Sequence, residues 1–458
     1  MQDITLSFQR DATPLYKQLY RHIAGEIHRG NLKEDTRLPS KRALVKHLKI
    51  SMSTVESAYS LLQSEGYIRA EAKRGFFVQG VMPLSPPAAA PADAPMPAPL
   101  PLPPFDFSTS AVDQSLFPFR TWSRLFRETL RDTPRLLEKG DAQGDEELRD
   151  SLAKFLYQYR GVRCTRDSLL IGAGVDYLLY VLFCLLPGGV SVAAEDPGYQ
   201  GAYRLAQRHK ARVLPLPLDE QGIRPDALYQ AKAKLVYVTP SHQFPLGLSM
   251  PIGRRTALLD WAQQTGGYII EDDYDSEFRH TSRPLPALQG LGCGNRVIYI
   301  GTFSRSLAPS MRIAYMVLPP DLMDAWRQLF RQGGDTVSRF DQQTLHRLIA
   351  GGHFARHLRR AGSAYTKRCK KLCDLLLTIP QARVQGEEAG LHFLLTIPQK
   401  SERELVARAQ RRGLRLHGLS EYCHRVPPLP STVVMGFAGL RDEELEPAVA
   451  LLREIWDV

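Results

Sequence analysis

The sequence lacks the features of a secreted, membrane-spanning or zinc-binding protein. Its cysteines are scattered over positions 164, 184, 293, 369, 373 and 423 without a CxxC or Cys/His spacing, which argues against a disulfide framework and a metal site. The first ten residues, MQDITLSFQR, carry no positive n-region, and the longest apolar run, YLLYVLFCLL, is too short to span a bilayer. We therefore expect a soluble cytoplasmic protein with buried free thiols, no metal and no membrane partner.

What is present is a long, basic, core-forming chain. Its 458 residues exceed one ordinary domain, and 43% hydrophobic with 23% charged residues is typical of globular protein. The net charge of +11 is uneven, because residues 1–80 hold 13 Lys and Arg against 8 Asp and Glu, a net of +5. This excess suggests a polyanion partner for the amino-terminal part, although charge alone favours a merely basic, soluble surface.

A segment rich in Pro and Ala divides the chain. Between Pro83 and Pro104 the sequence reads PLSPPAAAPADAPMPAPLPLPP, a composition that cannot build a core and tends toward extended polyproline II. We predict a linker over residues 81–104, with one domain over 1–80 and a second over 105–458.

The amino-terminal domain has the pattern of three short helices and a hairpin. The run after Pro14 places apolar residues at four-residue intervals and stops at Gly30. A second helix follows Ser40 and a third follows Ser51, both residues of capping type, and the third ends at Gly66. The stretch YIRAEAKRGFFV then predicts two strands, which completes a winged helix-turn-helix.

In this fold the third helix enters the DNA major groove. Its first turn offers hydroxyl groups that can reach phosphates or base edges, and basic residues of the second helix and of the hairpin turn can contact phosphates. The candidate DNA-binding residues are Ser51, Ser53, Thr54, Lys41, Arg42, Lys73, Arg74 and Gly75. Three-helix modules also serve as protein-interaction domains, so the pattern alone leaves both functions open.

This domain resembles a known family. The stretch PLYKQLYRHIAGEIHRGNLKEDTRLPSKRALVKHLKISMSTVESAYSLLQSEGYI is similar to the DNA-binding domain of GntR-type bacterial regulators, which implies a double-stranded DNA operator as partner. Met52 and Glu56 stand on the recognition helix where some of these regulators have arginines. The base readout of the family is therefore not carried over.

The second domain alternates strand and helix patterns. The apolar runs SLLIGAG, KLVYVTP, GYIIEDDYD and RVIYIGTFS alternate with helical stretches such as MPIGRRTALLDWAQQTG, which predicts an α/β domain with a mostly parallel sheet. Ligands of such sheets bind beyond the carboxyl ends of the strands. Asp272, Tyr274, Ser304 and Arg312 fall at or near such ends.

These residue types suit a pyridine ring that bears a phosphate. Asp272 would keep a ring nitrogen protonated, Tyr274 could donate to a 3'-oxygen, and Tyr199 has a flat face for stacking. The phosphate would be held by the following residues: Gly172, Ala173, Gly174, Ser304 and Arg312. Each feature is ambiguous by itself, because a strand-end Asp-Asp pair is often a helix cap or a solvated pair and a tyrosine is usually core.

Together and in order, these features resemble one family. FDFSTSAVDQSLFPFRTW, GDAQGDEELRDSLAKFL, YVTPSHQFPLGLSMPIGRR, IIEDDYDSEFR and GTFSRSLAPSMRIAYMVLP are similar to the fold-type I aminotransferase domain of the MocR/GabR regulators, a GntR subfamily. The resemblance implies a smaller carboxy-terminal α+β subdomain, a pyridoxal 5'-phosphate site that includes His242 and Thr302, an amine or amino-acid effector, and a head-to-tail homodimer.

Arg305 departs from this family. The family pattern GTFSKSLAP has a lysine there that holds pyridoxal phosphate as a Schiff base. A guanidinium stays protonated and is a poor nucleophile, so Arg305 keeps the charge without the chemistry. No lysine occurs between Lys234 and Lys367 to replace it. We therefore predict no catalytic residue and no enzymatic turnover.

Two further positions differ from the family. Gln200 and Glu421 stand where GabR-like proteins are expected to have arginines for a ligand carboxylate, unless the alignment is shifted and Arg425 or Arg441 takes that role.

Three interpretations of Arg305 stay open. The cofactor, or a preformed adduct of it, binds without a covalent bond; or the domain has lost the cofactor and is a dimerisation and sensing scaffold; or the arginine was engineered. The function predicted is a DNA-binding transcriptional regulator that senses a small ligand. The alternatives are a pyridoxal-phosphate-dependent aminotransferase and a cofactor-free scaffold fused to a DNA-binding domain.

Overall fold

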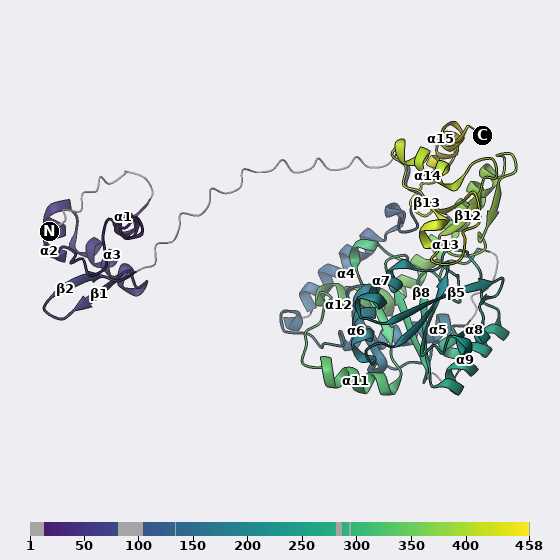
Figure 1. Cartoon of the computed structure of the whole chain (residues 1–458), viewed down its shortest axis with the longest axis horizontal. Helices are drawn as coiled ribbons and strands as arrows, with labels where there is room; N and C mark the ends of the chain where they lie inside the picture. The colour runs from purple at the N-terminus through teal and green to yellow at the C-terminus, as the bar shows by residue number, and fades with distance from the viewer. Residues whose placement is uncertain (1–12, 81–103, 133, 281–285, 293–294, 458) are drawn as a thin grey trace. The chain divides into compact units, whose positions relative to one another are not determined.

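A computed structural model describes residues 13–80, 104–132, 134–280, 286–292 and 295–457. The chain forms two compact units, residues 1–100 and 101–458 (Figure 1). The predicted linker over 81–104 lies outside the described residues except for Pro104.

The first unit is a three-helix bundle with a β-hairpin. It contains α1 (Leu15–His28), α2 (Lys41–Leu48), α3 (Met52–Ser64), β1 (Ile68–Glu71) and β2 (Gly75–Val78). The hydroxyl oxygens of Ser40 and Ser51 accept the amide hydrogens of Ala43 and Thr54, so both expected caps are made. The apolar stripe of α1 packs on that of α3, and Leu19, Val55 and Leu62 are completely buried. The predicted winged helix-turn-helix is confirmed.

The hairpin turn depends on unusual backbone geometry. Lys73 has a φ of 62° and Gly75 a φ of 113°, and the strands pair antiparallel from Ile68 opposite Val78 to Glu71 opposite Gly75. A backbone hydrogen bond from Leu38 to Phe76 then ties the hairpin to the segment before α2. The wing is thereby held beside the helices.

The second unit is built on a mostly parallel eight-stranded sheet. The strand order is β3-β10-β9-β8-β7-β4-β5-β6, and only β10 and β6 run antiparallel to their neighbours. Every residue of the central strands β7, β9 and β10 is buried, as expected when helices cover both faces of a sheet. The strands are β3 (Leu169–Gly172), β4 (Ser191–Asp196), β5 (Arg212–Asp219), β6 (Gly222–Ile223), β7 (Leu235–Val238), β8 (Tyr268–Asp273), β9 (Val297–Thr302) and β10 (Ala314–Val317).

Alternate residues of each strand pack against different helices. In β9, Ile298 and Ile300 pack with α6, α7 and α11, whereas Val297 packs with α8, α9 and α10. The helices around this sheet are α4 (Phe119–Asp132), α5 (Glu146–Arg160), α6 (Val175–Leu185), α7 (Gln200–Arg208), α8 (Pro225–Gln230), α9 (Ile252–Thr265), α10 (Leu288–Leu291), α11 (Pro320–Phe330) and α12 (Arg339–Ala350). The predicted α/β fold is confirmed.

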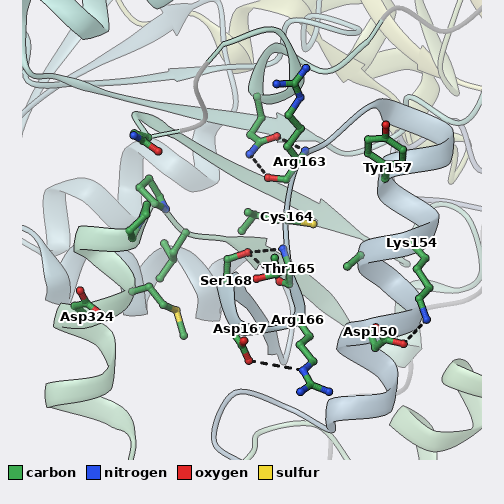
Figure 2. Close-up of a pocket in the computed structure, with 18 of the residues that line it drawn as sticks. Asp150, Lys154, Tyr157, Arg163, Cys164, Thr165, Arg166, Asp167, Ser168 and Asp324 are labelled. Atoms are coloured by element: carbon green, nitrogen blue, oxygen red, sulfur yellow. Dashed lines mark hydrogen bonds and ion pairs between the residues drawn. The ribbon is translucent and has the colours of Figure 1, made fainter.

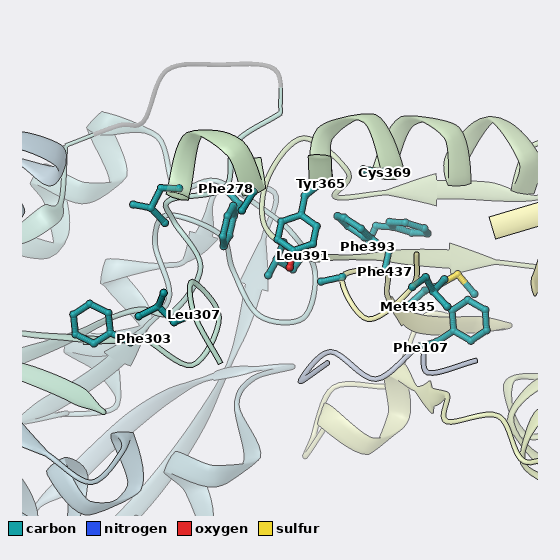
Figure 3. Close-up of a cluster of buried hydrophobic side chains, with 14 of the residues drawn as sticks. Phe107, Phe278, Phe303, Leu307, Tyr365, Cys369, Leu391, Phe393, Met435 and Phe437 are labelled. Carbon is teal, nitrogen blue, oxygen red and sulfur yellow. The ribbon is translucent and has the colours of Figure 1, made fainter. Parts of the chain in front are cut away.

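A smaller α+β subdomain completes the unit, as predicted. It comprises α13 (His353–Leu376), β11 (Arg383–Gln385), β12 (His392–Thr396), α14 (Glu402–Arg411), β13 (His417–Gly418), β14 (Thr432–Gly436) and α15 (Leu445–Trp456), with an antiparallel sheet ordered β11-β12-β14-β13. One continuous apolar cluster joins it to the large sheet, from Phe303 and Leu307 through Phe278 and Tyr365 to Phe393 (Figure 3). The two subdomains therefore share a core.

The five described cysteines are free thiols. Cys369 and Cys373 on α13 are buried, but Cys164, Cys184 and Cys423 are half-buried, so only two match the expected burial. Cys293 lies outside the described residues. None of the helices in the described ranges is long and apolar enough to cross a membrane.

A buried ion pair fixes the carboxyl end of β8. Arg160, the last residue of α5, donates to Asp273 at 2.8 Å and to Ser241 at 2.6 Å, and both charged side chains are at most 4% exposed. The Tyr299 hydroxyl donates to the same carboxylate at 2.5 Å. Burial opposes ionisation of Asp273, but Arg160 and Tyr299 hold its pKa below the ordinary value.

We expect Asp273→Ala to lower the free energy of unfolding by about 3–5 kcal/mol, because it removes the carboxylate that balances the buried charge of Arg160. The matched control is Asp150→Ala, which breaks the exposed pair with Lys154 and should cost about 0.5 kcal/mol or less. Urea denaturation followed by circular dichroism measures both. Equal losses in the two variants would contradict a structural role for the buried pair.

Candidate functional site

Most predicted cofactor residues meet at one cavity of about 370 Å³. It lies beyond the carboxyl ends of β7, β8 and β9 and beside the first turns of α6 and α7. The predicted residues that line it are Tyr199, Asp272, Tyr274, Thr302, Ser304, Arg305 and Arg312. Gly172, Ala173, Gly174 and His242 are not among the lining residues, but Gly174 lies beside Arg312 and His242 contacts Tyr274.

Asp272 has the properties of a partner for a ring cation. It points away from Asp273 because successive side chains of β8 face opposite sides of the sheet. One oxygen accepts the Tyr237 hydroxyl, and the other, Oδ1, is buried without a hydrogen-bond partner. Burial raises the pKa of Asp272 to about 7, although the Tyr237 hydrogen bond opposes this shift. A bound cation would satisfy Oδ1 and favour the ionised form.

Tyr274 is held by a buried histidine. Its hydroxyl donates to the His242 carbonyl oxygen at 3.0 Å and lies 3.1 Å from His242 Nδ1, which also lies 3.1 Å from Asp275. Gly390 makes room for this arrangement, since a Cβ there would lie 2.1 Å from the His242 ring. His242, Asp275 and His392 each place one metal-ligand atom within 4.8 Å of the others. His392 also contacts the Pro245 carbonyl oxygen at 3.2 Å, and burial, followed by the nearby His242 and Arg305, lowers its pKa well below the ordinary value.

Tyr199 provides an aromatic wall. It stands at the amino end of α7, and its ring lies nearly parallel to that of Tyr237, with centroids 6.3 Å apart and planes 25° apart. Burial raises the pKa of Tyr199 to about 12, so its hydroxyl stays protonated. The ring can pack against a flat ligand.

The opposite end of the cavity has the character of an anion site. Gly174 has a φ of 95° at the start of α6, and a Cβ there would lie 2.7 Å from the Arg312 guanidinium. Arg312 itself adopts a left-handed φ of 51°. The backbone amide of Ala173 donates to Thr336 at 3.2 Å and is therefore engaged. The amides that can donate to a bound anion are those of the first turn of α6, which begins at Val175, a residue that lines the cavity.

The Arg305 side chain reaches into the same cavity. Its neighbours Phe303 and Leu307 are anchored in the core (Figure 3), which directs Arg305 to the other side of the loop. The guanidinium donates to the Thr109 carbonyl oxygen. Burial lowers its pKa from a very high ordinary value, while Asp275 opposes the shift. None of the described residues lining this cavity is a lysine.

Sequence reasoning missed several lining residues, and Arg204 is the most informative. It lies one helical turn after Gln200 on α7, and that spacing could have found it. Gln200 lines the cavity, and its side-chain nitrogen is buried without a partner. Thr109, Ser110 and Tyr422 come from segments that are remote in sequence, so no local pattern marks them.

The two arginines that a shifted alignment would assign to the ligand carboxylate lie outside the cavity. Arg441 pairs with Glu443 and Glu444, Arg425 is exposed, and neither lines the cavity. Glu421 also lies outside it and accepts the amide of Gly418 at 3.0 Å.

A larger surface pocket of about 980 Å³ contains none of the predicted residues (Figure 2). Its lining includes Asp150, Lys154, Arg166 and Asp167, which pair as Lys154 with Asp150 at 2.6 Å and Arg166 with Asp167 at 3.9 Å. These side chains neutralise one another, so the smaller cavity remains the candidate ligand site.

The predicted DNA-binding residues gather on α2, α3 and the wing. Arg42, Lys73 and Arg74 are exposed, and Lys41 is half-buried with its ammonium 5.6 Å from the centre of the Phe76 ring. The hydroxyls of Ser53 and Thr54 lie 2.9 and 2.7 Å from Ser51 Oγ. The three hydroxyls therefore form one capping network at the start of α3.

Comparison with known proteins supports both halves of this description. Residues 15–78 match the family of bacterial regulatory proteins of the GntR family, and residues 105–452 match aminotransferase class I and II. Among solved structures, a kynurenine aminotransferase from Pyrococcus horikoshii superimposes with a TM-score of 0.68 at 24% identity, over 77% of this chain and 90% of that one. This likeness shows the fold.

Relatives align along nearly the whole chain. The HTH-type transcriptional regulator YdeL of Bacillus subtilis is 37% identical over 97% of both chains, and the probable rhizopine catabolism regulatory protein MocR of Rhizobium meliloti is 32% identical over 98% of this chain and 95% of its own. The pyridoxine biosynthesis regulator PdxR of Corynebacterium glutamicum is 30% identical over 95% and 94%. The chain therefore belongs to the MocR/GabR subfamily of GntR-type regulators and is a DNA-binding transcriptional regulator with an aminotransferase-like domain.

Proposed function

We propose that the aminotransferase-like domain senses pyridoxal 5'-phosphate, or an adduct of it, held without a covalent bond and without turnover. The observation that carries this proposal is the Arg305 guanidinium in a cavity without a lysine among its described lining residues. An arginine at this place keeps a positive charge but offers neither a nucleophilic amine nor a base for proton transfer.

The residues present fit the cofactor. Asp272 Oδ1 is buried and lacks a partner, and it would accept the ring N–H; Tyr199 would cover the ring. The phosphate would bind between Arg312, Ser304 and the first turn of α6, where Gly174 leaves space that a side chain would fill. When bound, pyridoxal phosphate supplies an electron-poor ring and an aldehyde that reacts with amines.

The relatives favour this ligand class. One of them is named for regulation of pyridoxine biosynthesis, which is consistent with a B6 compound as signal. Where an effector carries an acidic group, Arg204 and Gln200 would meet it, because both line the cavity one turn apart on α7. The cofactor-free scaffold is the second candidate, and it is favoured by the hydrogen bond from Arg305 to the Thr109 carbonyl oxygen, because the protein itself then supplies a partner for the guanidinium.

We further propose that the protein acts as a head-to-tail homodimer on a double-stranded operator. Support for operator binding comes from the match to the GntR family, and the dimer is what the resemblance to the MocR/GabR regulators implies. Light scattering at varied protein concentration tests the assembly.

We expect wild-type protein to bind pyridoxal phosphate in calorimetry without being fixed to it by borohydride. Arg305→Lys should instead acquire a visible absorbance band that borohydride fixes to the chain, because the lysine restores the amine. Arg305→Gln is the matched control without charge or amine. Borohydride fixation of the wild type would refute non-covalent binding, and no heat of binding would favour the cofactor-free scaffold.

We expect Asp272→Asn to raise the thermal midpoint of the ligand-free protein more at pH 8.5 than at pH 5.5. The pKa of Asp272 is raised to about 7 in the fold, so its stabilising contribution is present at low pH and is lost as pH rises through that value. Asparagine does not titrate and still accepts the Tyr237 hydroxyl.

The control is Asp226→Asn, an exposed carboxylate paired with Arg224, whose effect should be the same at both values of pH. Added pyridoxal phosphate should stabilise the wild type more than Asp272→Asn. A pH-independent effect of Asp272→Asn would show that this carboxylate is already ionised in the ligand-free fold.

A further inference from the structure

The recognition helix α3 carries no lysine or arginine. Its sequence is MSTVESAYSLLQS, and its inner face is fixed because Val55, Ala58, Tyr59 and Leu62 are completely buried. The side chains that project from the first two turns are therefore Met52, Ser53, Glu56 and Ser57, all exposed. The commonest specific contact in the major groove, a bidentate Arg or Lys on guanine, is unavailable from this helix.

The hydroxyl groups at the start of α3 are engaged within the protein. Ser51 Oγ accepts the Thr54 amide at 3.1 Å and lies within 2.9 Å of the hydroxyls of Ser53 and Thr54. These hydroxyl groups cap the helix, so a hydrogen bond from one of them to a DNA base would compete with the capping hydrogen bonds. Two longer side chains are left beyond the network, those of Met52 and Glu56.

Met52 is 39% exposed at the tip of the helix. An apolar side chain in this position has no role in the core of the unit, because it is not part of the buried cluster. Apolar side chains read the major groove through the C5-methyl group of thymine, which is the apolar group on a base edge there.

Glu56 lies one turn further along the same face. Its side chain is 53% exposed, and its carboxylate lies 3.4 Å from the Lys41 ammonium. Lys41 in turn lies over the Phe76 ring of the wing, so Glu56 is oriented by α2 and by the wing. A carboxylate beside DNA phosphates is repelled unless a base donates a hydrogen bond to it, and the cytosine N4 amino group is such a donor.

We propose that α3 reads its operator through Met52, packed on a thymine methyl group, and Glu56, accepting a hydrogen bond from a cytosine N4 amino group. The basic residues Arg42, Lys73 and Arg74 lie outside α3 and bind phosphates without selecting sequence. Glu56 also weakens binding to DNA that lacks the cytosine, so it acts by repulsion as well as by contact. This inference rests on DNA binding by the winged helix and adds the base specificity.

The test begins with selection of sites by the full-length protein from a random duplex DNA library. Each thymine of the selected site is then replaced by uracil, which removes only the methyl group, and affinities are measured by fluorescence anisotropy at fixed salt. We expect one thymine whose replacement weakens wild-type binding roughly fourfold, the worth of one buried methyl group. Met52→Ala should bind the thymine and uracil duplexes equally.

Glu56→Gln removes the charge and keeps the shape. We expect it to bind unrelated duplex DNA more tightly than the wild type does, and to lose roughly five- to tenfold discrimination at one cytosine. Ser64→Ala, at the exposed far end of α3, is the control and should select the wild-type site. Circular dichroism of each variant establishes that the winged helix is folded.

The outcomes separate this inference from the regulatory function. A selected site in which every uracil replacement is neutral, and which Glu56→Gln selects unchanged, overturns the proposed readout while DNA recognition stands. Failure to enrich any sequence overturns both the readout and sequence-specific regulation by this chain.

Discussion

Three consecutive carboxylates at the end of β8 impose the main constraint on the second unit. Glu271, Asp272 and Asp273 cannot all be ionised in one buried place, and strand alternation separates them. Glu271 accepts two amides at the start of α10, and Asp273 pairs with Arg160. Asp272 alone faces the cavity with one oxygen free. The ligand site thus depends on two neighbouring carboxylates being satisfied on the opposite face.

Arg305 is compatible with this arrangement because it preserves the charge balance of the cavity. Its guanidinium lies near Asp275 and Asp272 and donates to the Thr109 carbonyl oxygen, whereas Arg312 lies 4.0 Å from Asp176. The nearby carboxylates favour a cation at this position, whereas covalent chemistry needs an amine. A regulator requires only that ligand binding change the populations of its states.

In the first unit, too, different side chains have different roles. The buried stripe of α3 fixes which side chains project, and its hydroxyls stabilise the helix start. Exposed positive charge lies on α2 and on the wing and is absent from α3, so groups suited to phosphates and groups suited to base edges stand on different elements.

Local pattern was enough to predict both folds and the strands that precede Tyr274 and Ser304, since periodicity, caps and residue chemistry are encoded in short stretches. The missing amine at Arg305 was predicted from the resemblance to the family. Local pattern could not identify Thr109 or Tyr422, because segments far apart in sequence bring them to the cavity. Nor could it show that Tyr237 occupies one oxygen of Asp272, or that the Ser51 network engages the hydroxyls of α3. Tertiary packing decides which side chains of different elements become hydrogen-bond partners. It brings together donors and acceptors whose spacing in the sequence follows no rule.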